Sequence, residues 1–384
     1  MIYLDYNATT PTDPRVLEVM LPFFTEVYAN PASDHQMGAR SKDAVDSARD
    51  AVAALLNARA DEIIFTSGAT EANNLAILGC APKLEALGKT HIISSEIEHP
   101  AVLEPLLILE RAGWKVTLLK PDRTGKISST LVAAAITEKT GMVSIMFANN
   151  EIGTIQDMAA LGRITRERGI YLHTDAAQAV GNIPVDVDAL NIDLLSLSGH
   201  KFYAPKGIGA LFVRSRQPRV KVTPIMHGGG QERGFRSGTL NVPLIVGLGH
   251  AAELSKKEMK KRALRLSQLS NLLKTELTKV LPNIGFNGHP VDRLVHTLNI
   301  ELPGIDNKWL LLRLSNFCFS TGSACSTLHD IPSHVLLAIG LTEERIENCI
   351  RVGLGSLTTG DDIREFVSAL GRLQQGEVHN RKTP

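Results

Sequence analysis

The chain has 384 residues, of which 43% are hydrophobic and 21% charged, with a net charge of +1. These values are typical of a globular enzyme, the length favours two domains, and the charge excludes nucleic acid or a membrane surface as the expected main partner. No apolar run approaches the roughly 18 residues of a membrane span, and the N-terminus lacks a signal-peptide pattern, so we expect a cytoplasmic protein.

After an extended arm over residues 1–14, helices are predicted over 14–28 and 38–57 from the spacing of their apolar residues. Seven apolar runs rich in β-branched residues then predict strands separated by helical segments, at 62–66, 91–95, 115–120, 142–148, 169–175, 193–198 and 208–213. This alternation predicts an α/β fold with a mainly parallel sheet covered on both faces. We assign residues 15–255 to this large domain.

The pattern changes near residue 250. A long amphipathic helix is predicted over 254–281. Beyond it, strands at 296–302, 316–320 and 349–353 alternate with helices at 306–315, 332–340 and 360–374. We expect a smaller α+β domain formed by residues 256–384 together with residues 1–14.

The segment SLSGHKFYAPKGIGALFV (196–213) places Lys201 just beyond the end of a predicted strand, among small residues. A lysine in such a place can attack a bound carbonyl compound as a Schiff-base nucleophile. Asp175 ends another predicted strand, where its carboxylate can hold a pyridinium nitrogen. A lysine and an acid are the two anchors that pyridoxal 5'-phosphate (PLP) requires, whereas an isolated lysine is usually a solvated surface residue.

A phosphate needs backbone N–H donors at a helix start and small residues that allow close approach. Ser67, Gly68, Ala69 and Thr70 follow a predicted strand and precede a helix, which fits this requirement as well as that of an ordinary helix cap. Together with the pair Ser198 and His200, they predict a phosphate cup beside the lysine.

Further polar residues stand at predicted strand ends, where open α/β sheets bind ligands. The amides of Asn150 and Gln178 are placed to bind an oxygen on the cofactor ring. His99 is placed to stack on the ring or to move protons, although a loop histidine is more often structural. Arg351, within the apolar strand 349–353, is placed to bind a substrate carboxylate with two hydrogen bonds, and a structural ion pair is the alternative.

Cys325 lies among small polar residues (STGSACST, 320–327) directly after a predicted strand. This setting suits a thiol nucleophile that must approach a site and leave it again. The four cysteines form no CxxC pair, which indicates reduced thiols, and we expect the other three to be buried small hydrophobic residues: Cys80, Cys318 and Cys349. A metal site would use residues whose spacing matches no standard zinc pattern, namely Cys318, Cys325, His329 and His334.

A series of motifs from residue 3 to about 355 resembles the NifS/IscS-type cysteine desulfurases of the class-V aminotransferase family. The motifs are YLDYNATTP (3–11), NPAS (30–33), FTSGATEANNLAI (65–77), EHPAV (98–102), NNEIG (149–153), HTDAAQAVG (173–181), SGHKFYAPKGIGAL (198–211), HGGGQERGFRSGTL (227–240) and STGSACS (320–326). The resemblance implies the PLP-dependent fold type I (aspartate aminotransferase-like) and a homodimer with its active sites at the subunit interface. It implies conversion of L-cysteine to L-alanine, with the sulfur passed to an acceptor protein for iron–sulfur cluster assembly, tRNA thiolation or DNA phosphorothioation.

The resemblance also implies roles for individual residues. Lys201 would carry PLP as a Schiff base, Asp175 would pair with its ring nitrogen, and His99 would stack on the ring. Asn150 and Gln178 would reach the ring oxygen. The phosphate would be held by Ala69, Thr70, Ser198 and His200, with Thr239 from the other subunit. Arg351, with Asn150, would bind the substrate, and Cys325, on a loop with the length of the family's first group, would form the persulfide.

Two departures from the family pattern stand out: STGSAC replaces the usual SSGSAC, and Gly355-Ser356 replaces a usual Gly-Arg. The second leaves the contacts of that loop open. The alternative functions are a selenocysteine lyase, another fold type I reaction such as aminotransfer, or a non-catalytic scaffold. An aminotransferase would not need Cys325.

Overall fold

The computed structural model describes residues 1–281, 283–322 and 332–380. Its largest element is a seven-stranded sheet with the strand order β2-β8-β7-β6-β5-β3-β4. The strands are β2 (Ile63–Thr66), β3 (His91–Ser95), β4 (Lys115–Leu119), β5 (Thr140–Ser144), β6 (Tyr171–Asp175), β7 (Leu194–Ser198) and β8 (Gly209–Val213). Within this sheet β8 is antiparallel to both neighbours and the other pairs are parallel. The predicted seven-stranded, mainly parallel sheet is confirmed.

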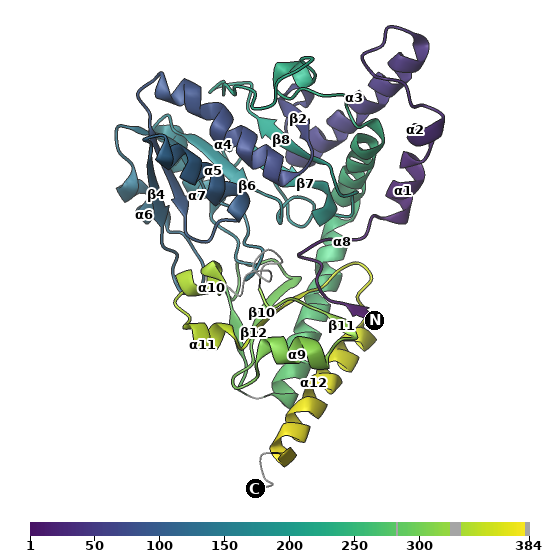
Figure 1. Ribbon diagram of the computed structural model, residues 1–384, viewed down its shortest axis with the longest axis vertical. Coiled ribbons are helices and arrows are strands. Elements are labelled where there is room, and N and C mark those ends of the chain that lie inside the picture. Colours follow the sequence, from purple (N-terminus) through teal and green to yellow (C-terminus); the bar gives the residue numbers. More distant parts are fainter. Residues whose placement is uncertain (282, 323–331, 381–384) are drawn as a thin grey trace.

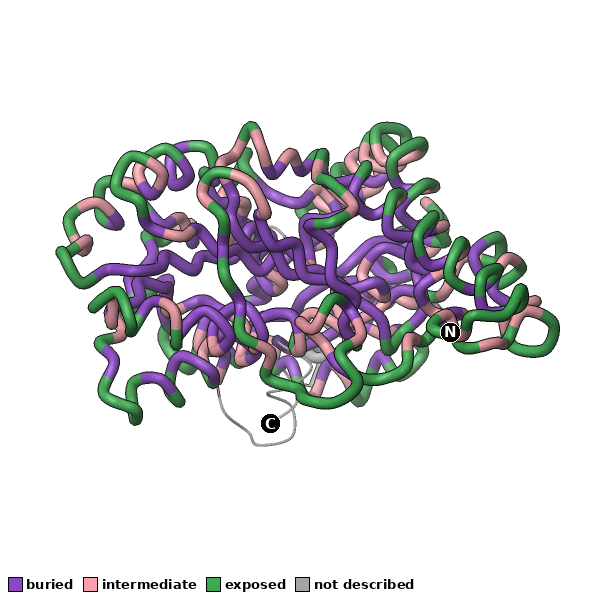
Figure 2. The backbone as a smooth tube through the Cα atoms, turned by 90° about the horizontal axis from the view of Figure 1, so that it is seen from above, coloured by how far each residue is buried: buried purple, intermediate pink, exposed green. Residues whose placement is uncertain are grey.

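Helices cover both faces of this sheet because its strands are apolar on both sides. In β2, Ile63 and Phe65 join one core cluster and Ile64 joins another, as the two-residue period of a strand requires. The first cluster includes residues of α3 (Gln36–Leu56), α7 (Met158–Glu167) and α8 (Val242–Val280); the second includes α4 (Ala69–Glu85) and α5 (Pro100–Arg111). Figure 2 shows the buried strands between helices whose outer surfaces are exposed. A short helix, α6 (Ser129–Ala135), lies beside α7.

A second region contains the antiparallel sheet β12-β10-β9, built from β9 (Gly285–Asn287), β10 (Thr297–Glu301) and β12 (Cys349–Gly353). Its helices are α9 (Asn307–Arg313), α10 (His334–Ala338), α11 (Glu343–Ile346) and α12 (Gly360–Asn380). The N-terminal arm joins this region because β1 (Ile2–Tyr3) pairs in parallel with β11 (Phe317–Cys318). The long α8 links the regions: it packs on α3 at one end and α12 at the other (Figure 1).

Some local predictions were wrong. The helix expected over 14–28 is two short helices, α1 (Pro14–Met20) and α2 (Pro22–Thr25), which meet at a proline that cannot donate a helical hydrogen bond. The long helix starts at Val242, because the Asn241 side chain accepts a hydrogen bond from Leu244 N and caps the helix there. Residue 255, the predicted end of the large domain, therefore lies inside α8. The strand expected over 142–148 ends at Ser144 because the chain beyond it turns to pair with residues 154–156. The strand β9 had no prediction.

The cysteine predictions are confirmed for two residues and wrong for one. Cys80 and Cys349 are buried, and burial raises the pKa of both thiols, that of Cys349 to about 12. Cys318 is only half-buried, because β11 is a two-residue strand in a two-stranded sheet.

The loop that departs from the family pattern is held by residues from other elements. Ser356 N donates to the Tyr203 hydroxyl at 2.9 Å. Arg265, on α8, donates from Nη1 to Gly355 O at 3.4 Å and Ser356 O at 3.1 Å. The guanidinium that binds the carbonyls of this loop therefore comes from α8.

In the described part of the chain, no helix combines the length and apolar character needed to cross a membrane.

Candidate active site

A cavity of about 590 Å³ lies beyond the ends of β5, β6 and β7, where an open α/β sheet binds its ligands. Most of the predicted site residues line it: Ala69, Thr70, His99, Asn150, Asp175, Gln178, Ser198, His200, Lys201 and Arg351. Thr239 is exposed and does not line this cavity. Cys325 lies outside the described residues. The tertiary structure thus brings together side chains that were predicted one strand end at a time.

Lys201 contacts the N-terminal arm. Its Nζ donates to Asn7 O at 2.7 Å and to Ala8 O at 2.9 Å. Gln178 Nε2 also donates to Asn7 O, at 3.0 Å. The arm is therefore one wall of the cavity. The sequence predicted no role for Asn7, and its one signal was its place in the motif YLDYNATTP.

Asp175 is the last residue of β6 and is buried, with 6% of its surface exposed. Its Oδ1 accepts from Ala177 N at 2.9 Å, and its Oδ2 accepts from Asn73 Nδ2, on α4, at 2.7 Å. Among the described residues each carboxylate oxygen has one donor, and the two donors fix the plane of the group. Asn73 lies within the motif FTSGATEANNLAI (65–77), but no role was predicted for it.

His99 precedes α5 as its N-cap, and its Nδ1 accepts a hydrogen bond from Ala101 N at 3.0 Å. The ring proton of the neutral form is therefore on Nε2. Burial lowers the pKa of His99, and Lys201 and His334 lower it further, while Asp175 opposes them. His99 is therefore a neutral imidazole at neutral pH.

The start of α4 fits a phosphate. Its N-cap is Gly68, so no side chain caps the helix, and the first N–H groups are left for a ligand at its positive end. Ser198 Oγ is 3.5 Å from where a Cβ on Gly68 would stand. A Cβ on Gly209 would lie 2.7 Å from the Cα of Gly68, so a glycine at 209 is needed for β8 to pass.

His200 completes this side of the cavity. Its Nδ1 is 3.0 Å from Thr9 Oγ1. Burial lowers the pKa of His200 to about 4, with Lys201 and Lys206 contributing, so the ring is a neutral hydrogen-bonding group at neutral pH. The cup, the lysine and the buried acid together have the donor and acceptor chemistry that PLP needs.

Arg351 lies on β12 and is almost fully buried. Its Nη2 pairs with Asp5 Oδ1 at 2.7 Å and its Nη1 donates to Asn150 O at 3.2 Å, while its Nε has no partner among the described residues. The structural ion pair weighed from sequence is thus present, and the same guanidinium lines the cavity.

The loops that follow β3 and β5 are tied to α10, which sequence analysis did not foresee. Glu98 Oε1 accepts from Ser95 Oγ at 2.7 Å and Met146 N at 2.9 Å, and burial raises the pKa of Glu98 to about 8. His334 Nε2 lies 2.9 Å from Glu98 O, and Ser333 Oγ donates to Glu151 Oε2 at 2.6 Å.

Among the residues that the structure describes, no three His, Cys, Asp or Glu side chains form a group suited to a metal ion.

Comparisons with known proteins agree with this geometry. The family model for aminotransferase class V matches residues 2–366. A cysteine desulfurase IscS from Anaeromyxobacter sp. (strain K) is 46% identical over 371 residues, which cover 96% of this chain and 91% of the relative. A solved NifS-like protein has a TM-score of 0.91 at 35% identity, covering 97% of this chain and 99% of its own. The structure described as SspA in complex with cysteine has a TM-score of 0.81 at 41% identity, covering 92% of this chain and 99% of its own.

The fold and the cavity define a PLP-dependent enzyme of fold type I. The chain belongs to the class-V aminotransferase family and, within it, to the NifS/IscS-type cysteine desulfurases.

Proposed function

We propose that the protein converts L-cysteine to L-alanine and takes the sulfur as a persulfide on Cys325, from which an acceptor protein receives it. The observation that carries this proposal is one cavity that contains an amine (Lys201), a buried acid (Asp175) and the uncapped start of α4. The bound cysteine in the SspA structure supports the choice of substrate.

In this proposal Lys201 Nζ carries PLP and, once the substrate has replaced it, takes the proton from the substrate Cα. Asp175 pairs with the ring nitrogen, neutral His99 stacks on the ring, and Asn150 and Gln178 bind the ring oxygen. The phosphate is held by Ala69, Thr70, Ser198 and His200. When bound, PLP withdraws electrons from the substrate Cα, which makes the substrate sulfur electrophilic.

Arg351 binds the substrate carboxylate, sharing its guanidinium between that group and Asp5. The Cys325 thiolate then forms an S–S bond to the substrate sulfur while the substrate C–S bond breaks. The electron pair of that bond stays on carbon, which gains protons and leaves as alanine. Ser320, five residues before Cys325, is bound to the Arg351 backbone in both directions, at 3.1 and 2.6 Å, which supports a shared site for the carboxylate and the thiol.

The proposal includes a homodimer in which Thr239 from each chain reaches the phosphate of the other. It also includes an acceptor protein that uses the sulfur for iron–sulfur cluster assembly, tRNA thiolation or DNA phosphorothioation, and a location in the cytoplasm. The exposure of Thr239 supports an intersubunit role.

The test uses purified protein loaded with PLP and given L-cysteine. We expect one alanine for each sulfur transferred, and a persulfide on Cys325 by mass spectrometry when no acceptor is present. Cys325→Ser should keep the visible absorbance of PLP but stop alanine release. Normal alanine release by that variant would remove Cys325 from the reaction. In place of alanine, 3-mercaptopyruvate would indicate aminotransfer, and pyruvate with free sulfide would indicate elimination. Sedimentation of the Thr239→Ala protein shows whether the dimer still forms when the contact of Thr239 with the phosphate is lost.

A further inference from the structure

Asn73 is a buried polar residue that has no role in the proposed reaction. Its side chain is inaccessible to solvent, and its Nδ2 donates to Asp175 Oδ2 at 2.7 Å. Its Oδ1 is buried with no hydrogen-bond partner among the described residues. An unsatisfied buried carbonyl destabilises a fold, so a native structure that keeps one needs a reason.

The orientation of this amide follows from its neighbour. Turned the other way, Asn73 would place its carbonyl oxygen against the Asp175 carboxylate, and two acceptors would repel. The amide therefore presents its N–H to Asp175, and its own oxygen is left without a partner in the part of the chain that the structure describes. A neutral donor also fixes the carboxylate without cancelling its charge, whereas a lysine or arginine would cancel it. The full negative charge remains to pair with a protonated ring nitrogen.

Asn73 is also well placed relative to the phosphate cup. It follows Ala69, the first residue of α4, by four positions, so the two share one face of the helix about 6 Å apart. One turn of α4 therefore carries the phosphate donors at its start and the group that fixes Asp175. The helix sets the spacing between the two points at which the cofactor would be held.

We propose that Asn73 is a positioning residue: it holds the Asp175 carboxylate in the plane that faces the ring nitrogen of PLP, and so keeps that nitrogen protonated. This rests on the proposed function of the cavity, in which Asp175 is the partner of the ring nitrogen. Asn73 itself touches neither the cofactor nor the substrate in this proposal.

The test compares Asn73→Ala with a matched control, Asn74→Ala. Asn74 is the next residue of the same helix turn, and its Nδ2 donates to Thr70 O within α4 rather than to Asp175. Each protein is loaded with PLP labelled with ¹⁵N in the ring, and the ¹⁵N chemical shift is followed against pH without substrate. PLP affinity, kcat and KM for L-cysteine, and the melting temperature of the PLP-free protein are measured beside it.

In Asn73→Ala the ring nitrogen should lose its proton at a pH at least about one unit lower than in the parent. Loss of one hydrogen bond to a charged group should lower kcat about 10- to 100-fold, with KM changed little. Asn74→Ala should match the parent in the nitrogen titration and in kcat. Equal nitrogen titrations in the two variants would overturn the proposal.

Asn73→Asp keeps the volume and gives an independent answer if Asn73→Ala does not fold. The introduced carboxyl and Asp175 would share a proton, because two carboxylates at hydrogen-bond distance cannot both be charged. The nitrogen titration should gain a step, and activity should recover toward acid pH, where the introduced carboxyl can donate. Absence of both effects overturns the proposal. A parent protein that binds no PLP or forms no alanine would instead contradict the proposed function.

Discussion

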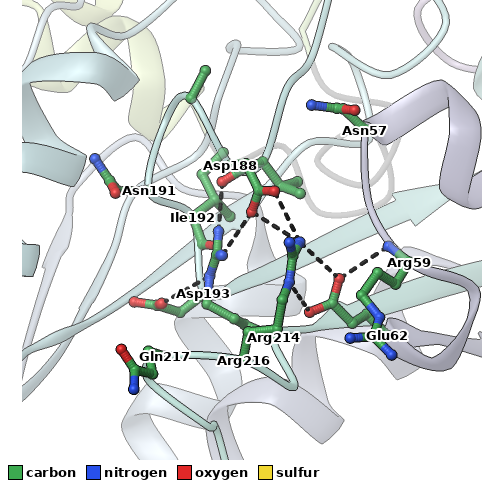
Figure 3. A network of polar contacts seen from close by, with 12 residues as sticks. Asn57, Arg59, Glu62, Asp188, Asn191, Ile192, Asp193, Arg214, Arg216 and Gln217 are labelled. Atoms are coloured by element: carbon green, nitrogen blue, oxygen red, sulfur yellow. Dashed lines mark hydrogen bonds and ion pairs between the residues drawn. The ribbon is translucent and has the colours of Figure 1, made fainter.

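The two ends of β8 place polar groups in opposite ways. At the Gly209 end lies the cavity, and several buried polar atoms around it have no partner in the described structure, among them Asn7 Oδ1, Asn73 Oδ1, Glu98 Oε2 and Arg351 Nε. At the Val213 end, Arg214 and Arg216 form a network with Asp188, Asp193 and Glu62 (Figure 3), and none of these side chains has such an atom.

The network satisfies its charges with several partners each. Arg214 pairs with Asp188 at 2.7 Å (Figure 3). It also donates to the carbonyls of Val187 and Ile192 at 2.7 and 2.8 Å. Asp193 also accepts from Leu172 N at 2.9 Å. The network ties β8 to the start of β7 and to the 186–188 turn. One end of the strand is therefore built for stability, whereas the other keeps hydrogen-bonding capacity for ligands at a cost in stability.

The largest test of this contrast is Lys201→Ala. Removal of the amine should lower alanine formation by several orders of magnitude, because both PLP attachment and proton transfer are assigned to it. The melting temperature of the PLP-free protein should change by a few degrees at most, since Lys201 Nζ donates to backbone carbonyls of the arm. Alanine assays and thermal unfolding measure the two effects. A large fall in stability would contradict the division between the two ends.

Arg214→Met tests the other end. It leaves Asp193 buried without one of its cations, so we expect the free energy of unfolding to fall by about 3 kcal/mol. The kcat and the PLP affinity of the folded protein should equal those of the parent. Denaturant unfolding gives the first quantity, and a loss of kcat at full PLP occupancy would show that the network also shapes the site.

Glu98→Gln tests a buried acid near the cavity. Burial raises the pKa of Glu98 from 4.5 to about 8, so the folded protein binds its proton more tightly than the unfolded chain does. The stability from that proton is fully present below pH 4.5 and is lost as the pH rises toward 8. Glutamine keeps the neutral form throughout, so the variant should gain on the parent by up to about 1.4 kcal/mol per pH unit in this window. Denaturant unfolding at a series of pH values measures the gap. A constant gap would mean that Glu98 is ionised when folded.

The smallest effect is expected for Lys42→Ala, on the surface of α3. Lys42 and Asp46 form an exposed i,i+4 pair at 3.1 Å. Such pairs contribute about 0.3–0.5 kcal/mol, so unfolding should barely change, and activity should not change at all. This variant sets the baseline for Arg214→Met. An effect of similar size in the two would make the network no more stabilising than an ordinary surface pair.

Local patterns in the sequence were enough for much of this protein. Apolar runs rich in β-branched residues predicted all seven strands of the large sheet, and side chains at the ends of these strands directed attention to Asp175, Ser198 and Lys201. Motif resemblance supplied the family, which the comparisons confirm. The sheet and the family could be inferred in this way because each strand pattern and each motif depends on residues close together in the chain.

The tertiary structure alone decided which distant residues support that site. Asn73 and Asp175 are 102 residues apart, and Asn7 and Lys201 are 194 apart. An asparagine on a helix and another in an extended arm carry no local signal of such partners. Their roles arise when the parallel strands bring α4 and the arm to one edge of the sheet, because burial there makes each unpaired polar atom costly and each donor specific.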